Sequence, residues 1–87
     1  MIRVAIPSQL IAYTGGATRV EAAGDTVCAV LDDLDRRYPG LKFRVIDEQD
    51  RIRRHMRIFV GQDEAKTVAV PVGDGGEVLI FGALSGG

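Results

Sequence analysis

The stretch Gly24–Gly40, GDTVCAVLDDLDRRYPG, decides the architecture because it is the clearest periodic segment of this 87-residue sequence. Its apolar residues recur at the spacing of one helical stripe, and charged residues take the opposite side. The stripe consists of Val27, Val30, Leu31, Leu34 and Tyr38. Asp25 or Thr26 can cap the helix N-terminus, and Pro39-Gly40 stops the helix. The pattern therefore predicts one helix near 26–38 with a single buried face.

Four segments around this helix alternate with the period of two that is typical of half-buried strands. They are Met1–Ile6, Ala17–Ala23, Arg54–Gly61 and Glu77–Gly82. Pro7 ends the first strand by removing a backbone donor, and the glycine-bearing turn 12–17 leads into the second. Residues 62–76 are expected to be mostly connection, with a turn signal at Asp74–Gly76.

The segment 41–50 leaves two alternatives open, a short helical turn or a loop. In either case it would cover the core with Leu41, Phe43, Val45 and Ile46. The predicted core otherwise contains the inward-facing residues of the strands and the helix. These are Ile2, Val4, Val20, Val27, Leu31, Leu34, Ile58, Val60, Val78 and Ile80.

The order strand, strand, helix, strand, strand predicts an α+β fold of two layers. Two hairpin strands are followed by a helix that crosses to a third strand, which gives a mixed sheet of four to five strands with one main helix on one face. This is the order of the β-grasp, or ubiquitin-like, fold. We expect one β-grasp domain over residues 1–82 and a flexible C-terminal tail over residues 83–87.

Composition excludes several functional classes. The 11 basic and 12 acidic residues give a net charge of −1, so nucleic-acid and membrane partners are not expected. The single cysteine, Cys28, excludes an internal disulfide, a cysteine-rich metal site and a ferredoxin-type iron–sulfur cluster. No run approaches the roughly 20 apolar residues of a membrane span, and the N-terminus lacks a signal-peptide pattern. A cytoplasmic protein is the simplest interpretation.

The sequence closes on VGDGGEVLIFGALSGG, in which a hydrophobic strand is followed by a short tail and Gly86-Gly87. Together with the helix-opening GDTVCAVLDDL, this closing stretch resembles the ThiS/MoaD-type sulfur carrier proteins over nearly the whole chain. The stretch IPSQLIAYTGG (residues 6–16) looks most similar to the carriers of thiocarboxylate-dependent cysteine biosynthesis. The small subunit of molybdopterin synthase is the next type in likeness.

The resemblance implies that the chain is a carried co-substrate with no catalytic residues, bound cofactor or metal of its own. An ATP-dependent, E1-like activating enzyme would adenylate the carboxylate of Gly87, and a sulfur donor would replace AMP to give a thiocarboxylate. That group would pass sulfur to a biosynthetic acceptor enzyme. Leu84, Ser85 and Gly86 would thread the tail into the partner, because glycine adds no bulk and five extended residues reach at most about 17 Å.

The run RIRRHMR (51–57) would place Arg51, Arg53, His55 and Arg57 on one face if it were extended. That face is either a solvated surface or a docking patch for an acidic partner. Phe59 would share it, which indicates a protein interface unless the segment 41–46 covers it. We expect Phe59 and Arg57, with Phe81 of the last strand, to dock a partner.

Two further questions stay open. Cys28 could be a reactive thiol in the first turn of the helix, but its apolar flank favours a packing role, and a lone His55 does not make a metal site. The same tail would also suit a ubiquitin-like modifier that forms an isopeptide bond through Gly87. A non-covalent interaction domain that merely ends in glycines is the third alternative.

Overall fold

The computed structural model describes residues 1–82, which form a five-stranded sheet, two α-helices and a 3₁₀ helix. The predicted tail, residues 83–87, lies outside the described residues. In chain order the elements are β1 (Ile2–Ala5), η1 (Ser8–Thr14), β2 (Arg19–Ala22), α1 (Val27–Arg37), α2 (Leu41–Val45), β3 (Met56–Val60), β4 (Asp63–Ala65) and β5 (Glu77–Gly82).

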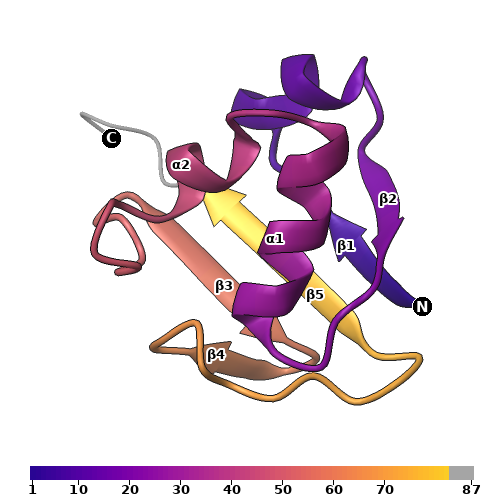
Figure 1. Ribbon diagram of the computed structural model, residues 1–87, viewed down its shortest axis with the longest axis vertical. Helices are drawn as coiled ribbons and strands as arrows, with labels where there is room; N and C mark the ends of the chain where they lie inside the picture. The colour runs from indigo at the N-terminus through magenta and orange to yellow at the C-terminus, as the bar shows by residue number, and fades with distance from the viewer. Residues whose placement is uncertain (83–87) are drawn as a thin grey trace.

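The sheet is mixed, and its last strand in sequence lies at its centre (Figure 1). The strand order is β2-β1-β5-β3-β4. β1 and β2 form the predicted antiparallel hairpin, with Val4 opposite Val20, whereas β5 runs parallel to β1 and antiparallel to β3. This arrangement confirms the predicted α+β architecture with a mixed sheet.

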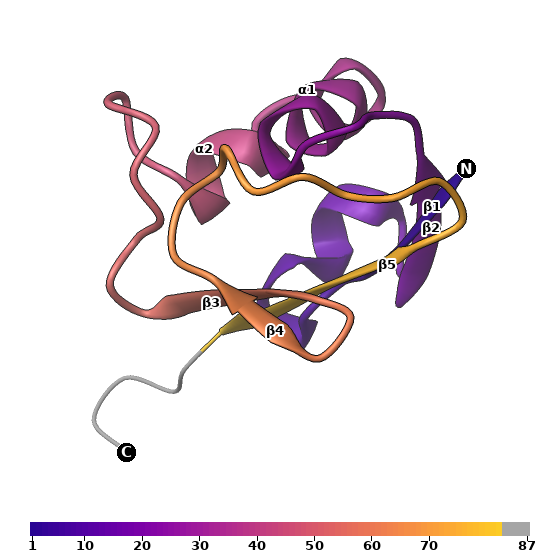
Figure 2. The same cartoon turned by 90° about the horizontal axis from the view of Figure 1, so that it is seen from below.

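The helix α1 forms where the apolar stripe predicts it, between a cap at Thr26 and a last turn at Tyr38. The Thr26 side chain accepts a hydrogen bond from the backbone N–H of Ala29 at 3.1 Å, which satisfies one of the unpaired donors of the first turn. Figure 2 shows α1 and α2 on the same side of the sheet. The opposite face of the sheet is therefore left without a covering helix in the described part of the chain.

The core lies between α1 and the sheet, and it contains most of the residues expected from sequence. Ile2, Val4, Val27, Leu31, Leu34, Ile58, Val78 and Ile80 are buried. Val20 and Val60 differ from the prediction in degree, because both are only half-buried while still packing against the core. The buried cluster also includes Ile6, Leu10, Ala22, Val30, Leu41, Val45, Ile46, Met56, Ala65, Val68 and Val72.

The segment 41–50 resolves as the short helix α2 and a following loop. Leu41, Val45 and Ile46 are buried as expected, but Phe43 is not a core residue, since it points outward and is 53% exposed. Gly40 precedes the helix with φ 94°, a left-handed conformation that favours glycine. Pro39-Gly40 thus separates α1 from α2.

One predicted boundary was wrong, and two short elements were not predicted. The third strand begins at Met56, because residues 54–55 form a turn in which the N–H of Met56 donates to the carbonyl of Arg53 at 2.9 Å. The connection 62–76 contains the short edge strand β4, whose Ala65 pairs with Ile58. The helix η1 forms before the predicted glycine-bearing turn and takes in its first residues up to Thr14, and the turn itself lies at Gly15 and Gly16.

Candidate functional site

The uncovered side of the sheet, here called the open face, carries the outward residues of all five strands. The registers place them next to one another, with inward residues alternating between them. The open face comprises Arg3, Ala5, Arg19, Glu21, Arg57, Phe59, Glu64, Glu77, Leu79 and Phe81. Its middle is apolar and its two edges are charged.

Phe59 and Phe81 form the apolar centre of the open face. Their ring centroids lie 5.6 Å apart with an interplanar angle of 82°, an edge-to-face geometry that aromatic pairs prefer. Phe81 keeps 49% of its surface exposed although it lies on the central strand. Phe59 is half-buried by this neighbour and not by the segment 41–46, which packs on the core side. Large exposed aromatic surface of this kind is typical of protein interfaces.

The charged edges of the open face pair within the protein. Arg57 lies 3.5 Å from Glu64, and Arg19 lies 3.4 Å from Glu77. Pairs as exposed as these contribute little to folding. Their consequence here is that the apolar centre is bordered by charge of both signs, as the polar rim of an interface usually is.

Gly82 is the last described residue and the last residue of β5. Its backbone is in register with Met56, and its carbonyl accepts a hydrogen bond from the side-chain amide of Gln9 at 3.0 Å. A Cβ at Gly82 would lie 2.5–2.8 Å from the amide atoms of Gln9, so only glycine leaves room for this contact. Because Gly82 directly follows Phe81, β5 ends at the border of the open face.

The structure brings together three of the residues predicted from sequence and separates others. Arg57, Phe59 and Phe81 meet on the open face, as the alternation predicts. The predicted arginine face over 51–57 is wrong, because the turn at 54–55 interrupts it: Arg51 pairs with Asp47, and Arg53 stacks on Phe43 at 4.5 Å. Leu84, Ser85, Gly86 and Gly87 lie outside the described residues.

Among residues 1–82, three groups have a pKa that departs clearly from its ordinary value, and all three lie in the helices or in the loop after α2. The N–H of Ala23, followed by the Arg36 guanidinium, lowers the pKa of the Asp33 carboxyl, and the N–H of Arg51 lowers the pKa of the Asp47 carboxyl. A hydrogen bond to Asp32 raises the pKa of the Lys42 amine. Each shift is explained by a contact that holds the fold together, so none of them points to acid–base chemistry.

Cys28 is partly buried in the first turn of α1, where its backbone N–H donates to the carbonyl of Val68 at 2.8 Å. Its side chain packs against the core, on the face of the sheet opposite Phe81. Over residues 1–82 no group of three or more His, Cys, Asp or Glu side chains could hold a metal ion. Within the same residues no helix has the length and apolar content needed to cross a membrane.

Sequence reasoning missed Gln9 and Glu64. Gln9 lies on a 3₁₀ helix, whose short period leaves no recognisable apolar stripe, and its partner Gly82 is 73 positions away. Glu64 lies on a strand of three residues, too short for alternation to be read. The register that places Glu64 opposite Phe59 appears only in the folded sheet.

The chain is similar to proteins of known type over its whole length. It is 34% identical over 91 residues to the sulfur carrier protein CysO of Mycobacterium tuberculosis, covering 99% of this chain and 98% of the relative. The crystal structure of M. tuberculosis CysO matches with a TM-score of 0.90 at 32% identity, over 97% of this chain and 100% of that one. No model of a known protein family matches the sequence.

Two other solved structures share the architecture. The BexX/CysO complex of Amycolatopsis orientalis contains a chain that matches with a TM-score of 0.92 at 32% identity, covering 100% of both chains. The structure of SAMP1 from Haloferax volcanii matches with a TM-score of 0.76 at 26% identity, covering 99% of this chain and 98% of that one. These likenesses confirm the predicted β-grasp fold.

The same relatives are sulfur carrier proteins. They confirm two predictions: that this chain carries sulfur, and that it is a carried substrate and not an enzyme. With 34% identity to CysO across nearly the full length of both proteins, this chain belongs to the ThiS/MoaD-type family of sulfur carrier proteins.

Proposed function

We propose that the carboxylate of Gly87 is the group that carries sulfur. The observation that supports this most directly is the position of Gly82 at the end of the central strand β5, beside the exposed Phe81. The chain also belongs to the sulfur carrier family. Ala83 to Gly87 would then extend from the border of a docking face. Leu84, Ser85 and Gly86 thread the partner's channel and bring Gly87 to the reacting centre.

The chemistry needs an activated acyl group, because an ionised carboxylate is a poor electrophile. A carboxylate oxygen of Gly87 attacks the α-phosphorus of ATP in an E1-like activating enzyme, and pyrophosphate leaves. A sulfur nucleophile then attacks the carbonyl carbon of the acyl-adenylate, and AMP leaves with the bonding electron pair. The product is a thiocarboxylate, which hands its sulfur to a biosynthetic acceptor enzyme. The need for ATP favours the cytoplasm as the location of this cycle.

The open face supplies the contact with the activating enzyme in this proposal. Phe59 and Phe81 provide the apolar centre, and Arg57 with Glu64 provides part of the rim. Docking through a face that ends at Gly82 limits how far the reacting carbon can lie from the body of the carrier, because only five residues separate Gly82 from the end of Gly87. Positioning of this kind is a major source of rate enhancement when two groups must meet.

Intact-mass spectrometry tests the proposal. The protein is incubated with the organism's own adenylating enzyme, ATP and sulfide, and the intact mass of the starting protein first establishes that the chain ends at Gly87. The expected product is heavier by the exchange of one oxygen for sulfur, and the change maps to the C-terminal peptide. Omitting ATP is the control. An unmodified Gly87 with an enzyme that binds the protein would contradict the carrier chemistry.

A second candidate function is favoured by the likeness to a small archaeal modifier protein. In this alternative the activated Gly87 is attacked by a lysine amine of another protein, so an isopeptide bond forms in place of the thiocarboxylate. Cell extracts that contain the tagged protein would then show covalent conjugates of higher mass, with the C-terminal peptide linked to lysine. Their absence alongside a thiocarboxylate product assigns the protein to sulfur transfer.

A further inference from the structure

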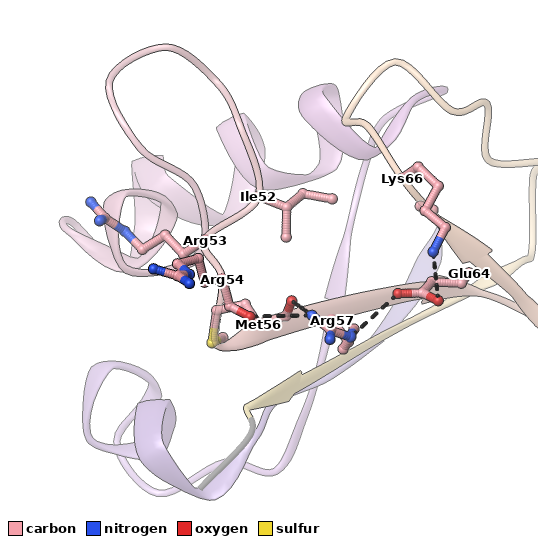
Figure 3. A pocket seen from close by; sticks show the side chains of 8 residues that line it. Ile52, Arg53, Arg54, Met56, Arg57, Glu64 and Lys66 are labelled. Carbon is pink, nitrogen blue, oxygen red and sulfur yellow. Dashed lines mark hydrogen bonds and ion pairs between the residues drawn. The ribbon is translucent and has the colours of Figure 1, made fainter. Parts of the chain in front are cut away.

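A pocket of about 370 Å³ lies between the turn that precedes β3 and the edge strand β4 (Figure 3). Its apolar lining is Ile52, Met56 and Ala65. The remaining lining residues are Arg53, Arg54, Arg57, Glu64 and Lys66, so four cationic residues and one carboxylate border the pocket. Arg57 and Lys66 lie against Glu64, whereas Arg53 and Arg54 extend away from it (Figure 3). We call it the basic pocket. Its charge contrasts with the chain as a whole, which has a net charge of −1.

The contacts of these side chains do not neutralise all of the positive charge of the pocket. Glu64 serves two cations at once, with Lys66 at 3.1 Å and Arg57 at 3.5 Å. Arg53 donates to the backbone carbonyl of Phe43 at 2.7 Å, which is not an anion. The guanidinium of Arg54 makes neither a hydrogen bond nor an ion pair with any residue in the range 1–82. It can therefore bind an outside anion without breaking an internal pair.

The basic pocket adjoins both parts of the candidate site. Met56 of its floor is in register with Gly82, the last residue of β5, and Arg57 of its rim is in register with Phe81. Met56 and Ala65 of its floor are inward residues, whereas Arg57 and Glu64 of its rim belong to the open face. A partner that sits on the open face and extends around the edge strand β4 would therefore also reach this pocket.

We propose that the basic pocket receives an acidic side chain of the activating enzyme, a proposal that rests on the function proposed above. The apolar floor accepts the methylene part of a Glu or Asp side chain, and Arg54 binds its carboxylate through a fork of donors that matches two oxygens. A protein partner is favoured over nucleic acid because the positive charge is local, within a chain of net negative charge.

The positive charge of the basic pocket should speed the association of the carrier with the activating enzyme, and it should not affect the chemical step. Charges near the rim of an interface steer association and make it depend on salt, while they leave the bound geometry largely unchanged. Replacing Arg54 should therefore raise the KM for the carrier, or slow its association, without lowering kcat. Loss of a charge-assisted contact at this site is expected to change affinity by about tenfold.

The experiment measures binding and thiocarboxylation of the full-length protein with the organism's own adenylating enzyme at two salt concentrations. Arg54→Gln is compared with Arg36→Gln, which removes the same charge from α1 at the opposite end of the sheet, where Asp33 bonds to the N–H of Ala23 beyond β2. Arg54→Lys keeps the charge but not the fork of donors, so it should keep most of the association rate and dissociate faster than the wild type. Thermal unfolding of each variant checks that the fold is unaffected.

The expected result is an association rate that falls about tenfold in Arg54→Gln at low salt, falls less at high salt, and is unchanged in Arg36→Gln. Equal effects in the two variants, or none in Arg54→Gln, would overturn the inference and leave the carrier function standing if the wild type is still thiocarboxylated. Failure of the wild type to bind the enzyme overturns both. Movement of the Arg54 amide resonance in the free protein when Gly86-Gly87 is removed would show that the chain's own carboxylate occupies the pocket, which also overturns it.

Discussion

The side-chain amide of Gln9 donates a hydrogen bond to the backbone carbonyl of Gly82 at 3.0 Å, and this contact joins η1 to the end of β5. η1 itself is well anchored: Leu10 is buried, and the Thr14 hydroxyl lies within hydrogen-bonding distance of the carbonyl of Ala17 at 2.7 Å. A fixed element thus holds the base of the predicted tail. We therefore expect this contact to help set the direction in which the carboxylate of Gly87 is presented to the partner.

Gly82→Ala should release this contact without damaging the fold. Gly82 is outside the left-handed region, so alanine is tolerated there, and the added Cβ would displace the flexible amide end of Gln9. We expect a change in unfolding free energy below about 1 kcal/mol, because an exposed hydrogen bond contributes little net. The rate of thiocarboxylate formation should fall severalfold, both in Gly82→Ala and in Gln9→Ala.

A double-mutant cycle separates this contact from independent effects. If Gln9 and Gly82 act as one unit, the Gln9→Ala/Gly82→Ala variant should be no slower than either single variant. Gln62→Ala, in the exposed turn between β3 and β4, is the matched control and should react like the wild type. Additive losses in the double variant would show that the two residues act separately.

Phe81→Ala should weaken docking far more than Phe43→Ala. The two rings are exposed to similar extents, 49% and 53%, but Phe81 lies on the open face, whereas Phe43 lies on α2 under the Arg53 guanidinium. Truncating an aromatic anchor of an interface typically costs more than about 1 kcal/mol, so the KM for the carrier should rise about tenfold. Steady-state kinetics with the activating enzyme measures both. A larger effect at Phe43 would place the docking surface on the helical side.

Leu31→Ala should destabilise the fold strongly, because the side chain is fully buried beneath α1. Large-to-small substitutions in a core cost about 2–5 kcal/mol through lost burial and a residual cavity. Val20→Ala removes fewer atoms from a half-buried site and should cost clearly less. Denaturant unfolding followed by circular dichroism gives both values. An unchanged midpoint in Leu31→Ala would exclude it from the core.

Asp33→Asn should change the pH dependence of stability. Contacts with the N–H of Ala23 and with Arg36 lower the pKa of the Asp33 carboxyl below 3.8 in the folded protein. The folded state therefore binds fewer protons than the unfolded state, so the stabilisation is complete above the ordinary pKa and is lost as pH falls through the folded value. The amide that replaces the carboxyl in this variant cannot titrate, and it loses the ion pairs with Arg36 and Arg37.

The measurement is unfolding free energy against pH for wild type and Asp33→Asn. The wild type should be more stable at pH 7, and the two curves should converge as pH falls below 3.8. Glu48→Gln removes one charge from the exposed loop after α2 and controls for net charge. Curves that stay parallel down to the lowest pH would mean that ionisation of Asp33 does not contribute.

Local periodicity was enough to predict α1 and the main strands. The stripe from Val27 to Leu34 is buried along its length, and the alternation in β5 puts Val78 and Ile80 inward and Phe81 outward as expected. These elements are long enough for their pattern to be unambiguous, and the tertiary structure does not override it. The shared face of Phe59 and Phe81 followed from the same alternation.

Contacts between distant segments explain what the sequence did not reveal. The run 51–57 has the pattern of a strand, but the N–H of Arg53 donates to the carbonyl of Val45 at 3.0 Å, which ties that stretch to α2 and turns the chain before β3. The basic pocket arises from this turn and from Lys66 beyond β4. Such placements depend on long-range contacts, which no local pattern encodes.

Adding one residue after Gly87 should abolish thiocarboxylate formation while leaving the fold intact. The added residue converts the reacting carboxylate into an amide and moves the terminal carboxylate one residue further from Gly82. The body of the protein is unaffected, because residues 1–82 contain the sheet and the core. Intact-mass spectrometry should show complete loss of the sulfur-exchanged product, and circular dichroism should show an unchanged melting curve.

Gly86→Ala is the graded companion to this extension. It keeps the carboxylate of Gly87 in place, but the methyl group restricts the backbone and adds volume where the partner's channel must be narrow. We therefore expect slower but measurable thiocarboxylate formation. Ser85→Ala, which removes one oxygen without adding bulk, should react at close to the wild-type rate. If the extended protein is modified as well as the wild type, then Gly87 is not the carrier group, and the reacting site must be sought on the open face or elsewhere in residues 1–82.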